Sequence, residues 1–217
     1  AEEELPDGDR DFRPLAFPDG TFATTYAGRD RHGRDRLFYI PLSSSLTGSN
    51  RIRLTSNRIT VQDSSLIPNG GNNFVAAWTT SRDKLFAQTF NAQGQPAGIA
   101  NPLEVGTPTS SNKYHRVVTA GLSDGRFIVV WTGEDNDGRG VYGRYYFPSG
   151  TPMGPEFLIN TSQTGDQHAT DVDVFSDDSI VVTYEDSSGD TDGYASYARL
   201  FDGGGNAVQS SEQPLGP

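Results

Sequence analysis

The sequence predicts an all-β protein, a β-propeller-like array of four four-stranded repeats. An apolar run recurs four times, at spacings of 52, 53 and 53 residues, and each copy ends on an aromatic residue. The runs begin at Phe22, Phe74, Phe127 and Ile180 and end at Tyr26, Trp78, Trp131 and Tyr184. No apolar pattern with the period of a helix extends over a useful length, so the sequence favours strands throughout.

The third copy shows the pattern most clearly. A turn at Asp124-Gly125 leads into β-branched and aromatic residues that end at Trp131. A second turn, rich in Asp and Gly, returns the chain as a strand from Val141 to Phe147. Asp and Gly tolerate the positive φ that tight turns require, and β-branched residues suit a pleated sheet. The segment therefore predicts a β-hairpin.

Each copy has room for four strands. One strand precedes the apolar run, a return strand follows it, and a short strand closes the repeat. The preceding strands are expected at Phe12–Phe17, Ile59–Ile67, His115–Ala120 and Ala169–Phe175. Four strands in about 53 residues is typical of a propeller blade, whose second strand packs between neighbouring blades. A β-sandwich-type repeat array is the alternative, but it should show weaker internal similarity.

The whole chain, residues 1–217, is expected to form a single propeller-like domain. The repeats are placed at approximately residues 10–57, 58–110, 111–164 and 165–217, and residues 1–9 read as a tail strand. That tail either closes a ring on the last blade or follows a preceding repeat of a longer array. Both explanations stay open at this stage.

The third repeat resembles repeats found in large bacterial secreted and surface proteins. The shared features are Asp124–Trp131, Tyr142–Arg144, Phe147 and Gly150–Phe157. The other copies are weaker: the first has Pro41–Ser45 where the family turn would fall, and the second lacks the Asp-rich loop. The resemblance implies a propeller-like module of an adhesin-like protein of the kind associated with repeats-in-toxin segments.

Composition narrows the function classes. The formal charge of −11 argues against a nucleic-acid partner, because nucleic-acid binders need a basic face. No stretch approaches the roughly 18 apolar residues of a membrane span. The absence of Cys removes disulfides, a catalytic thiol and thiolate metal sites. The chain begins at Ala1, as a processed protein or a fragment would, and we expect an extracellular or cell-surface location.

Two loops carry candidate calcium ligands. Asp135, Asn136 and Asp137 lie in the loop of the third repeat, and Asp190 and Asp192 lie in that of the fourth. Alternating Asp and Asn residues can supply several of the oxygens that Ca²⁺ requires. Neither loop has the EF-hand pattern, so a hairpin turn that uses Asp and Gly for their backbone conformations is the alternative.

Aromatic residues of the return strands are the candidate ligand-binding site, namely Tyr142, Tyr145, Tyr194 and Tyr197. Apolar ring faces beside Asp, Asn and Arg are what sugar recognition uses. Packing between blades is the alternative use of these rings.

No single catalytic constellation stands out. The three histidines are scattered, at His32, His115 and His168. Carboxylate pairs occur at Glu134 with Asp135 and at Glu185 with Asp186, whereas the catalytic pair of a glycosidase normally occurs once. The sequence therefore predicts that the protein is not an enzyme and has no catalytic residues.

These observations favour a non-enzymatic extracellular module for binding or adhesion, which recognises a glycan or a surface protein and has Ca²⁺ as its candidate cofactor. A structural subunit of a surface fibre or larger assembly, self-associating or part of a longer chain, is the alternative. A glycosidase is the weaker alternative. Nucleic acid and membrane insertion are not expected.

Overall fold

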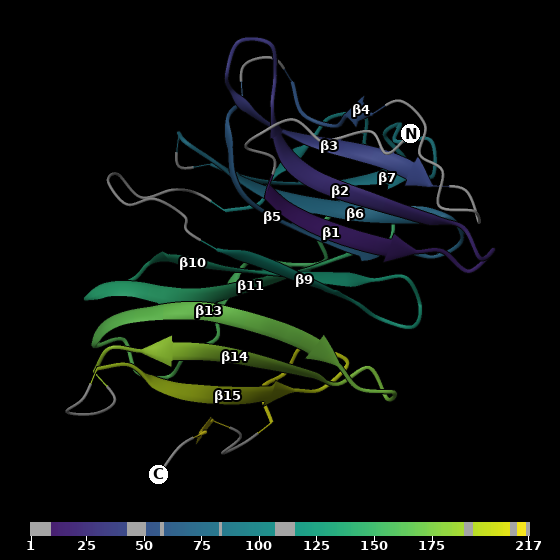
Figure 1. The fold of residues 1–217 in the computed structure, drawn as a ribbon. Coiled ribbons are helices and arrows are strands. Elements are labelled where there is room, and N and C mark those ends of the chain that lie inside the picture. The colour runs from purple at the N-terminus through teal and green to yellow at the C-terminus, as the bar shows by residue number, and fades with distance from the viewer. Residues whose placement is uncertain are drawn as a thin grey trace.

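A computed structural model describes residues 10–42, 51–56, 59–82, 84–106, 116–188, 193–208 and 212–215. In these residues every regular element is a β-strand, and the strands form four successive four-stranded groups that stack from one end of the molecule to the other (Figure 1). We call these groups blades 1 to 4. The predicted all-β, propeller-like fold is confirmed. Within the described part of the chain no helix is long and apolar enough to span a membrane.

Each blade is an antiparallel meander whose strands are bonded in chain order. Blade 1 contains β1 (Arg10–Ala16), β2 (Phe22–Arg29), β3 (Asp35–Leu42) and β4 (Ile52–Arg53). Blade 2 contains β5 (Val61–Pro68), β6 (Asn73–Thr80), β7 (Leu85–Asn91) and β8 (Leu103–Glu104). Blade 3 contains β9 (Val117–Gly121), β10 (Phe127–Glu134), β11 (Gly138–Tyr146) and β12 (Phe157–Leu158). Blade 4 contains β13 (Gly165–Val174), β14 (Ile180–Asp186), β15 (Ala195–Phe201) and β16 (Gln213–Pro214).

Successive blades pack face to face through the aromatic residues near the ends of their second strands. Trp78 of β6 lies in the apolar cluster between blades 1 and 2, Trp131 of β10 in that between blades 2 and 3, and Tyr184 of β14 in that between blades 3 and 4. All three side chains are at most 2% exposed. These three rings therefore lie between successive blades, whereas the equivalent Tyr26 of β2 stacks on Phe12 and Phe38 within blade 1.

The two middle blades bury both of their faces, because side chains alternate along a strand. In β6, Ala76 and Trp78 belong to the cluster shared with blade 1, whereas Val75 and Ala77 belong to the cluster shared with blade 3. The described strands of blades 1 and 4 lie at opposite ends of the stack (Figure 1). These end blades carry exposed rings: Phe22 of blade 1 is 41% exposed and Phe175 of blade 4 is 52% exposed. The predicted tail strand at residues 1–9 lies outside the described residues.

Blades 3 and 4 are also joined by a short parallel pairing, in which β11 meets β13 at Gly138 opposite Gly165 and at Arg139 opposite Asp166. This pairing merges the third and fourth sheets into one eight-stranded sheet, which the sequence-based prediction of separate blades lacked. It requires glycine, because a Cβ at Gly138 would lie 2.6 Å from the carbonyl oxygen of Gly165.

The turns between first and second strands tie neighbouring blades together. Gly125 has a φ of 85° in blade 3, and Asp178 takes the equivalent place in blade 4 with a φ of 65°. Asp is one of the few residues other than Gly that tolerate this conformation. The Asp178 carboxylate accepts hydrogen bonds from the amide and hydroxyl groups of Ser123, at 2.7 and 2.8 Å. One turn residue therefore both shapes its own hairpin and holds the preceding blade.

The burial of Trp78 predicts that Trp78→Ala destabilises the whole array. Trp78 is fully buried between blades 1 and 2, and truncating a large core aromatic typically costs about 3–5 kcal/mol. Tyr194→Ala is the control, since Tyr194 is 54% exposed and the expected cost is within about 0.5 kcal/mol. Urea unfolding of both variants measures the difference. Equal costs would contradict the role of the interblade ring.

Candidate active site at the junction of blades 3 and 4

The loops between second and third strands lie toward the left in Figure 1, and the loops between first and second strands lie toward the right. Each left-hand loop contains one residue whose side-chain oxygen accepts a hydrogen bond from the amide N–H two residues later. These residues are Asp30, Thr80, Asp135 and Asp186. In the Asp loops, one oxygen of the aspartate side chain therefore stabilises a turn, as the alternative interpretation of these loops expects.

The second carboxylate oxygen distinguishes Asp135 from Asp30. In blade 1 the Oδ2 atom of Asp30 accepts a 3.0 Å hydrogen bond from Nε of Arg36. In blade 3 the Oδ2 atom of Asp135 is buried and has no hydrogen-bond partner among the described residues. Gly140 provides the space for it, because a Cβ built on Gly140 would lie 2.9 Å from that oxygen. A buried carboxylate oxygen without a donor is costly, so this group requires an explanation.

Burial is the main reason that the pKa of Asp135 is raised above its ordinary value of 3.8. The negative charges of Asp137 and Asp166 raise the pKa further, whereas the hydrogen bond from the Asp137 amide opposes the increase. The Asn160 side chain opposes it least, since its amide group already donates hydrogen bonds to Ser162 and Gln167. Asp137 is exposed on the same loop, whereas Asp166 is half-buried on β13. The parallel pairing of β11 with β13 brings Asp166 to this site.

Two further contacts hold the site in place. Tyr142 donates a 2.8 Å hydrogen bond to the carbonyl oxygen of Glu134, which fixes the strand just before Asp135. Asn160, from the connection between blades 3 and 4, accepts a 2.7 Å hydrogen bond from the amide of Val141 and donates one to Gln167. Asn160 and Gln167 are both buried, so the Asp135 loop packs against side chains that are fixed by hydrogen bonds.

The predicted calcium ligands are placed only in part. Asp135 and Asp137 lie together in the β10–β11 loop, and the Asn136 side chain is hydrogen-bonded to Gln163. Asp190 and Asp192 lie outside the described residues. Where the structure describes the chain, no group of three or more acidic or histidine side chains is arranged to hold a metal ion. Calcium binding stays a prediction.

The four predicted ligand-binding tyrosines lie in different surroundings. Tyr142 stacks on Trp131, with ring centroids 6.1 Å apart, and Tyr197 stacks on Tyr184 at 5.6 Å. Tyr145 belongs to the apolar cluster between blades 3 and 4, where burial raises its pKa to about 12. Tyr194 is exposed and lies beside the ring of His168, at 5.8 Å. Glycan contact by these rings stays a prediction, for which Tyr194 is the accessible candidate.

Sequence reasoning missed Asp166 and Gly140 as parts of this site. It discounted the Glu134–Asp135 pair because such pairs recur. The turn hydrogen bond does recur, since Asp186 of blade 4 also accepts hydrogen bonds from the hydroxyl and amide groups of Ser188. The role of Gly140 depends on a carboxylate that only the folded chain places beside it.

Comparison with known proteins gives matches in structure but not in sequence: no family model matches the chain, and no curated protein matches it. A GH93 α-L-arabinofuranosidase of Fusarium graminearum, solved with arabinobiose, is similar over 97% of this chain and 68% of its own, with a TM-score of 0.67 and 11% identity. A PL25 ulvan lyase, bound to -[GlcA(1-4)Rha3S]-, is similar over 93% of this chain and 54% of its own, with a TM-score of 0.61 and 10% identity. A thermostable family-43 glycoside hydrolase is similar over 95% of this chain and 75% of its own, with a TM-score of 0.57 and 13% identity.

These matches correct the expectation of a non-enzymatic adhesion module or fibre subunit. The three proteins just described are two glycoside hydrolases and a polysaccharide lyase, all of them enzymes that act on carbohydrates. At such low identity the similarity is one of fold. The chain spans about two thirds of the arabinofuranosidase and about half of the lyase.

The geometry of Asp135 predicts an unusual dependence of stability on pH. A carboxyl group whose pKa is raised by folding binds its proton more tightly in the native state than in the unfolded chain. The free energy of unfolding therefore falls as the pH rises from 3.8 through the raised pKa. We expect Asp135→Asn to match the wild type at about pH 3 and to be at least as stable at about pH 7. Urea unfolding at both pH values measures this.

Asp30→Asn is the contrasting variant. Burial alone would raise the pKa of Asp30, but hydrogen bonds from the amides of Arg34 and His32 and from Arg36 lower it to about 2. Its stabilising effect is present above 3.8 and is lost as the pH falls through about 2, so this variant should be less stable than the wild type at neutral pH. A comparable loss of stability at neutral pH for Asp135→Asn would show that folding stabilises the ionised Asp135 carboxylate, which would contradict the prediction.

Proposed function

We propose that this protein is a carbohydrate-processing enzyme that hydrolyses a glycan, with Asp135 as its proton donor. The observation that carries the proposal is the Asp135 carboxyl group, whose Oδ2 atom is buried without a partner among the described residues and whose pKa is raised. A carboxyl group that keeps its proton to higher pH can donate it to the leaving oxygen of a glycosidic bond.

The second role that glycosidic hydrolysis requires is an ionised carboxylate, acting as a base or a nucleophile. Asp166 suits this role better than Asp137, because a strand holds its backbone whereas Asp137 lies in the loop before β11. Its amide donates a 2.8 Å hydrogen bond to the hydroxyl of Ser187 in the next loop. The negative charge of Asp166 is one of the causes that raise the pKa of Asp135, which favours Asp135 as the acid of the pair.

The fold supports a glycan as the partner, since the arabinofuranosidase was solved with arabinobiose and the lyase with an oligosaccharide. An extracellular location, which the composition favours, belongs to the same proposal. A polymeric glycan outside the cell would be a substrate that such an enzyme can reach.

The test is reducing-end release from a panel of purified polysaccharides, both neutral and acidic. We expect Asp135→Asn to lower kcat by about 10²- to 10⁴-fold, the usual contribution of a positioned general acid. Asp166→Asn should also lower kcat, whereas KM should change little in both variants because neither removes a ground-state contact.

Asp177→Asn is the matched control for that experiment. Asp177 is an exposed turn residue of blade 4, on the opposite side of the stack, and it accepts hydrogen bonds from Ser179. The kcat of this variant should equal that of the wild type. Full activity in Asp135→Asn would assign the proton donor elsewhere, and a folded wild type that cleaves no member of the panel would overturn the proposed reaction.

A further inference from the structure

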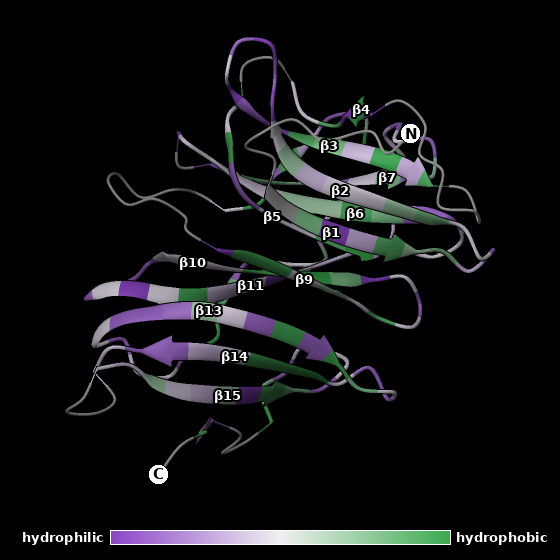
Figure 2. Ribbon diagram, in the orientation of Figure 1, coloured by the Kyte–Doolittle hydropathy of each residue, from purple (hydrophilic) through white to green (hydrophobic). Residues whose placement is uncertain are grey.

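The first repeat of this acidic chain is basic. Residues 10–57 contain eight arginines and four aspartates, although the whole chain has a net charge of −11. The β2–β3 loop, which carries Arg31 and Arg34, is hydrophilic and projects from the stack (Figures 1 and 2). A concentration of positive charge on one blade of an acidic protein creates a local field that attracts anions.

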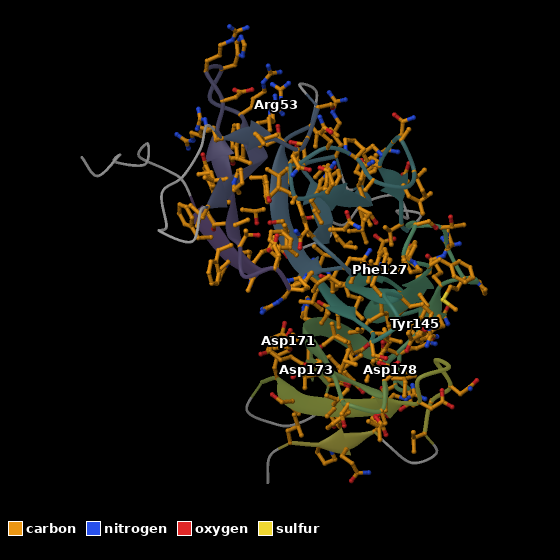
Figure 3. All side chains as sticks on the ribbon, turned by 90° about the vertical axis from the view of Figure 1, so that its right-hand side faces the viewer. Arg53, Phe127, Tyr145, Asp171, Asp173 and Asp178 are labelled. Carbon is orange, nitrogen blue, oxygen red and sulfur yellow. The ribbon has the colours of Figure 1, made fainter. Side chains whose placement is uncertain are left out.

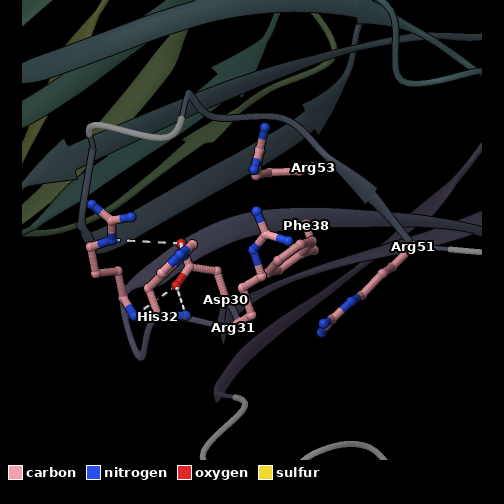
Figure 4. A pocket seen from close by; sticks show the side chains of 7 residues that line it. Asp30, Arg31, His32, Phe38, Arg51 and Arg53 are labelled. Carbon is pink, nitrogen blue, oxygen red and sulfur yellow. Dashed lines mark hydrogen bonds and ion pairs between the residues drawn. The ribbon is translucent and has the colours of Figure 1, made fainter.

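A cavity of about 590 Å³ lies at this loop, which is the size of a small-ligand site. Figure 4 shows the side chains that converge on it from the loop, β3 and β4. Its lining residues are Asp30, Arg31, His32, Arg34, Phe38, Arg51 and Arg53. Four of the seven are arginines, and Asp30 is the single acidic residue among them.

The Asp30 carboxylate does not cancel this positive charge, because it already serves the fold. Its Oδ2 atom lies 2.9 Å from Nη2 of Arg36, a buried arginine that is not part of the lining. Its Oδ1 atom accepts hydrogen bonds from the amides of His32 and Arg34. The Arg34 side chain also comes within ion-pair distance of Asp30, at 3.7 Å, so we assign no ligand contact to Arg34.

Buried aromatic rings hold one of the lining arginines in place. The guanidinium of Arg51 lies 4.5 Å from the ring centroid of Phe38, and its Nη1 donates a 3.3 Å hydrogen bond to the hydroxyl of Tyr26. The rings of Tyr26 and Phe38 are themselves stacked at 5.5 Å. These contacts hold Arg51 in one orientation, so a donor for an anion is already positioned beside an apolar ring.

We propose that this cavity binds an acidic saccharide, with Arg31 and Arg51 gripping a carboxylate or sulfate group. Arginine matches the planar geometry of a carboxylate and donates charge-assisted hydrogen bonds to either anion. The inference rests on the proposed function, since it names the class of glycan that the enzyme would take. The β2–β3 loop supplies part of the cavity lining, and Asp135 lies in the corresponding loop of blade 3.

One other occupant fits the charge. Residues 165–217 contain eleven acidic residues and one arginine, and Asp171, Asp173 and Asp178 of blade 4 lie toward the end of the stack opposite Arg53 (Figure 3). Blade 4 of a second copy could therefore approach the basic cavity. We favour the saccharide, because the cavity volume suits a small ligand better than an exposed strand.

The test is calorimetric binding of oligogalacturonate, which carries carboxylates, and of dextran sulfate, with unmodified dextran as the neutral probe. We expect one or both acidic probes to bind, more weakly at high salt, and neutral dextran not to bind. The double variant Arg31→Gln/Arg51→Gln should raise Kd by about tenfold or more, as loss of charge-assisted hydrogen bonds does. Arg82→Gln, at the corresponding loop of blade 2, is the matched control and should bind like the wild type.

Three outcomes would overturn the inference: no binding of either acidic probe, unchanged binding by the double variant, or a dimer in light scattering that the double variant abolishes while no glycan binds. The last outcome would assign the cavity to a second copy. Asp135→Asn separates this inference from the proposed function. It should bind the acidic probes like the wild type, and hydrolysis of a neutral glycan without binding of either acidic probe would uphold the function while refuting the cavity.

Discussion

The stacking of each blade on the one before it is the interaction on which the rest of this structure depends. A single four-stranded sheet with a closing strand of two residues cannot remove both of its faces from water. Stacking buries the residues of the second strand on both sides, as in β6 and β10, and each interface contains the aromatic ring near the end of one second strand. Because the driving force is apolar area removed from water, it acts through Trp78, Trp131 and Tyr184 without requiring helices or disulfides.

The same stacking places the chemistry at the edges of the blades. The second strand must end at a turn that leaves the apolar zone, so each blade presents a polar residue there, and one side-chain oxygen of that residue closes the turn. The surroundings determine what the second oxygen of an aspartate does. Arg36 binds that of Asp30, whereas Gly140 leaves that of Asp135 in a buried space beside Asp166. The turn aspartate of blade 3 is thus a candidate catalytic residue, because the neighbouring strand β13 supplies the negative charge of Asp166 instead of a hydrogen-bond donor.

The uneven distribution of charge is the second organising feature. The first repeat is basic and the last is strongly acidic, while the second strands of the middle blades are buried. Charged side chains are excluded from the stacked faces by the cost of burying them, so they collect at loops and at the two ends of the stack. The Asp135 carboxyl group and the arginine-lined cavity both lie at blade edges because charged side chains are excluded from the stacked faces.

The sequence by itself determined the fold class, the number of blades and the residues that fill the interblade space, because the alternation of apolar residues and the recurrence of Trp78 and Trp131 are local properties of the chain. It also offered a hairpin turn as one interpretation of the loop that holds Asp135. Only the tertiary structure decided which turn aspartate lacks a partner for its second oxygen, since Asp166 reaches Asp135 through a parallel pairing of two strands from different repeats. The arginine-lined cavity likewise needs Arg31 and Arg53, from separate segments, on one side of blade 1. Which side chains meet depends on how the blades stack. The repeats are similar in sequence, so the sequence alone does not reveal those contacts.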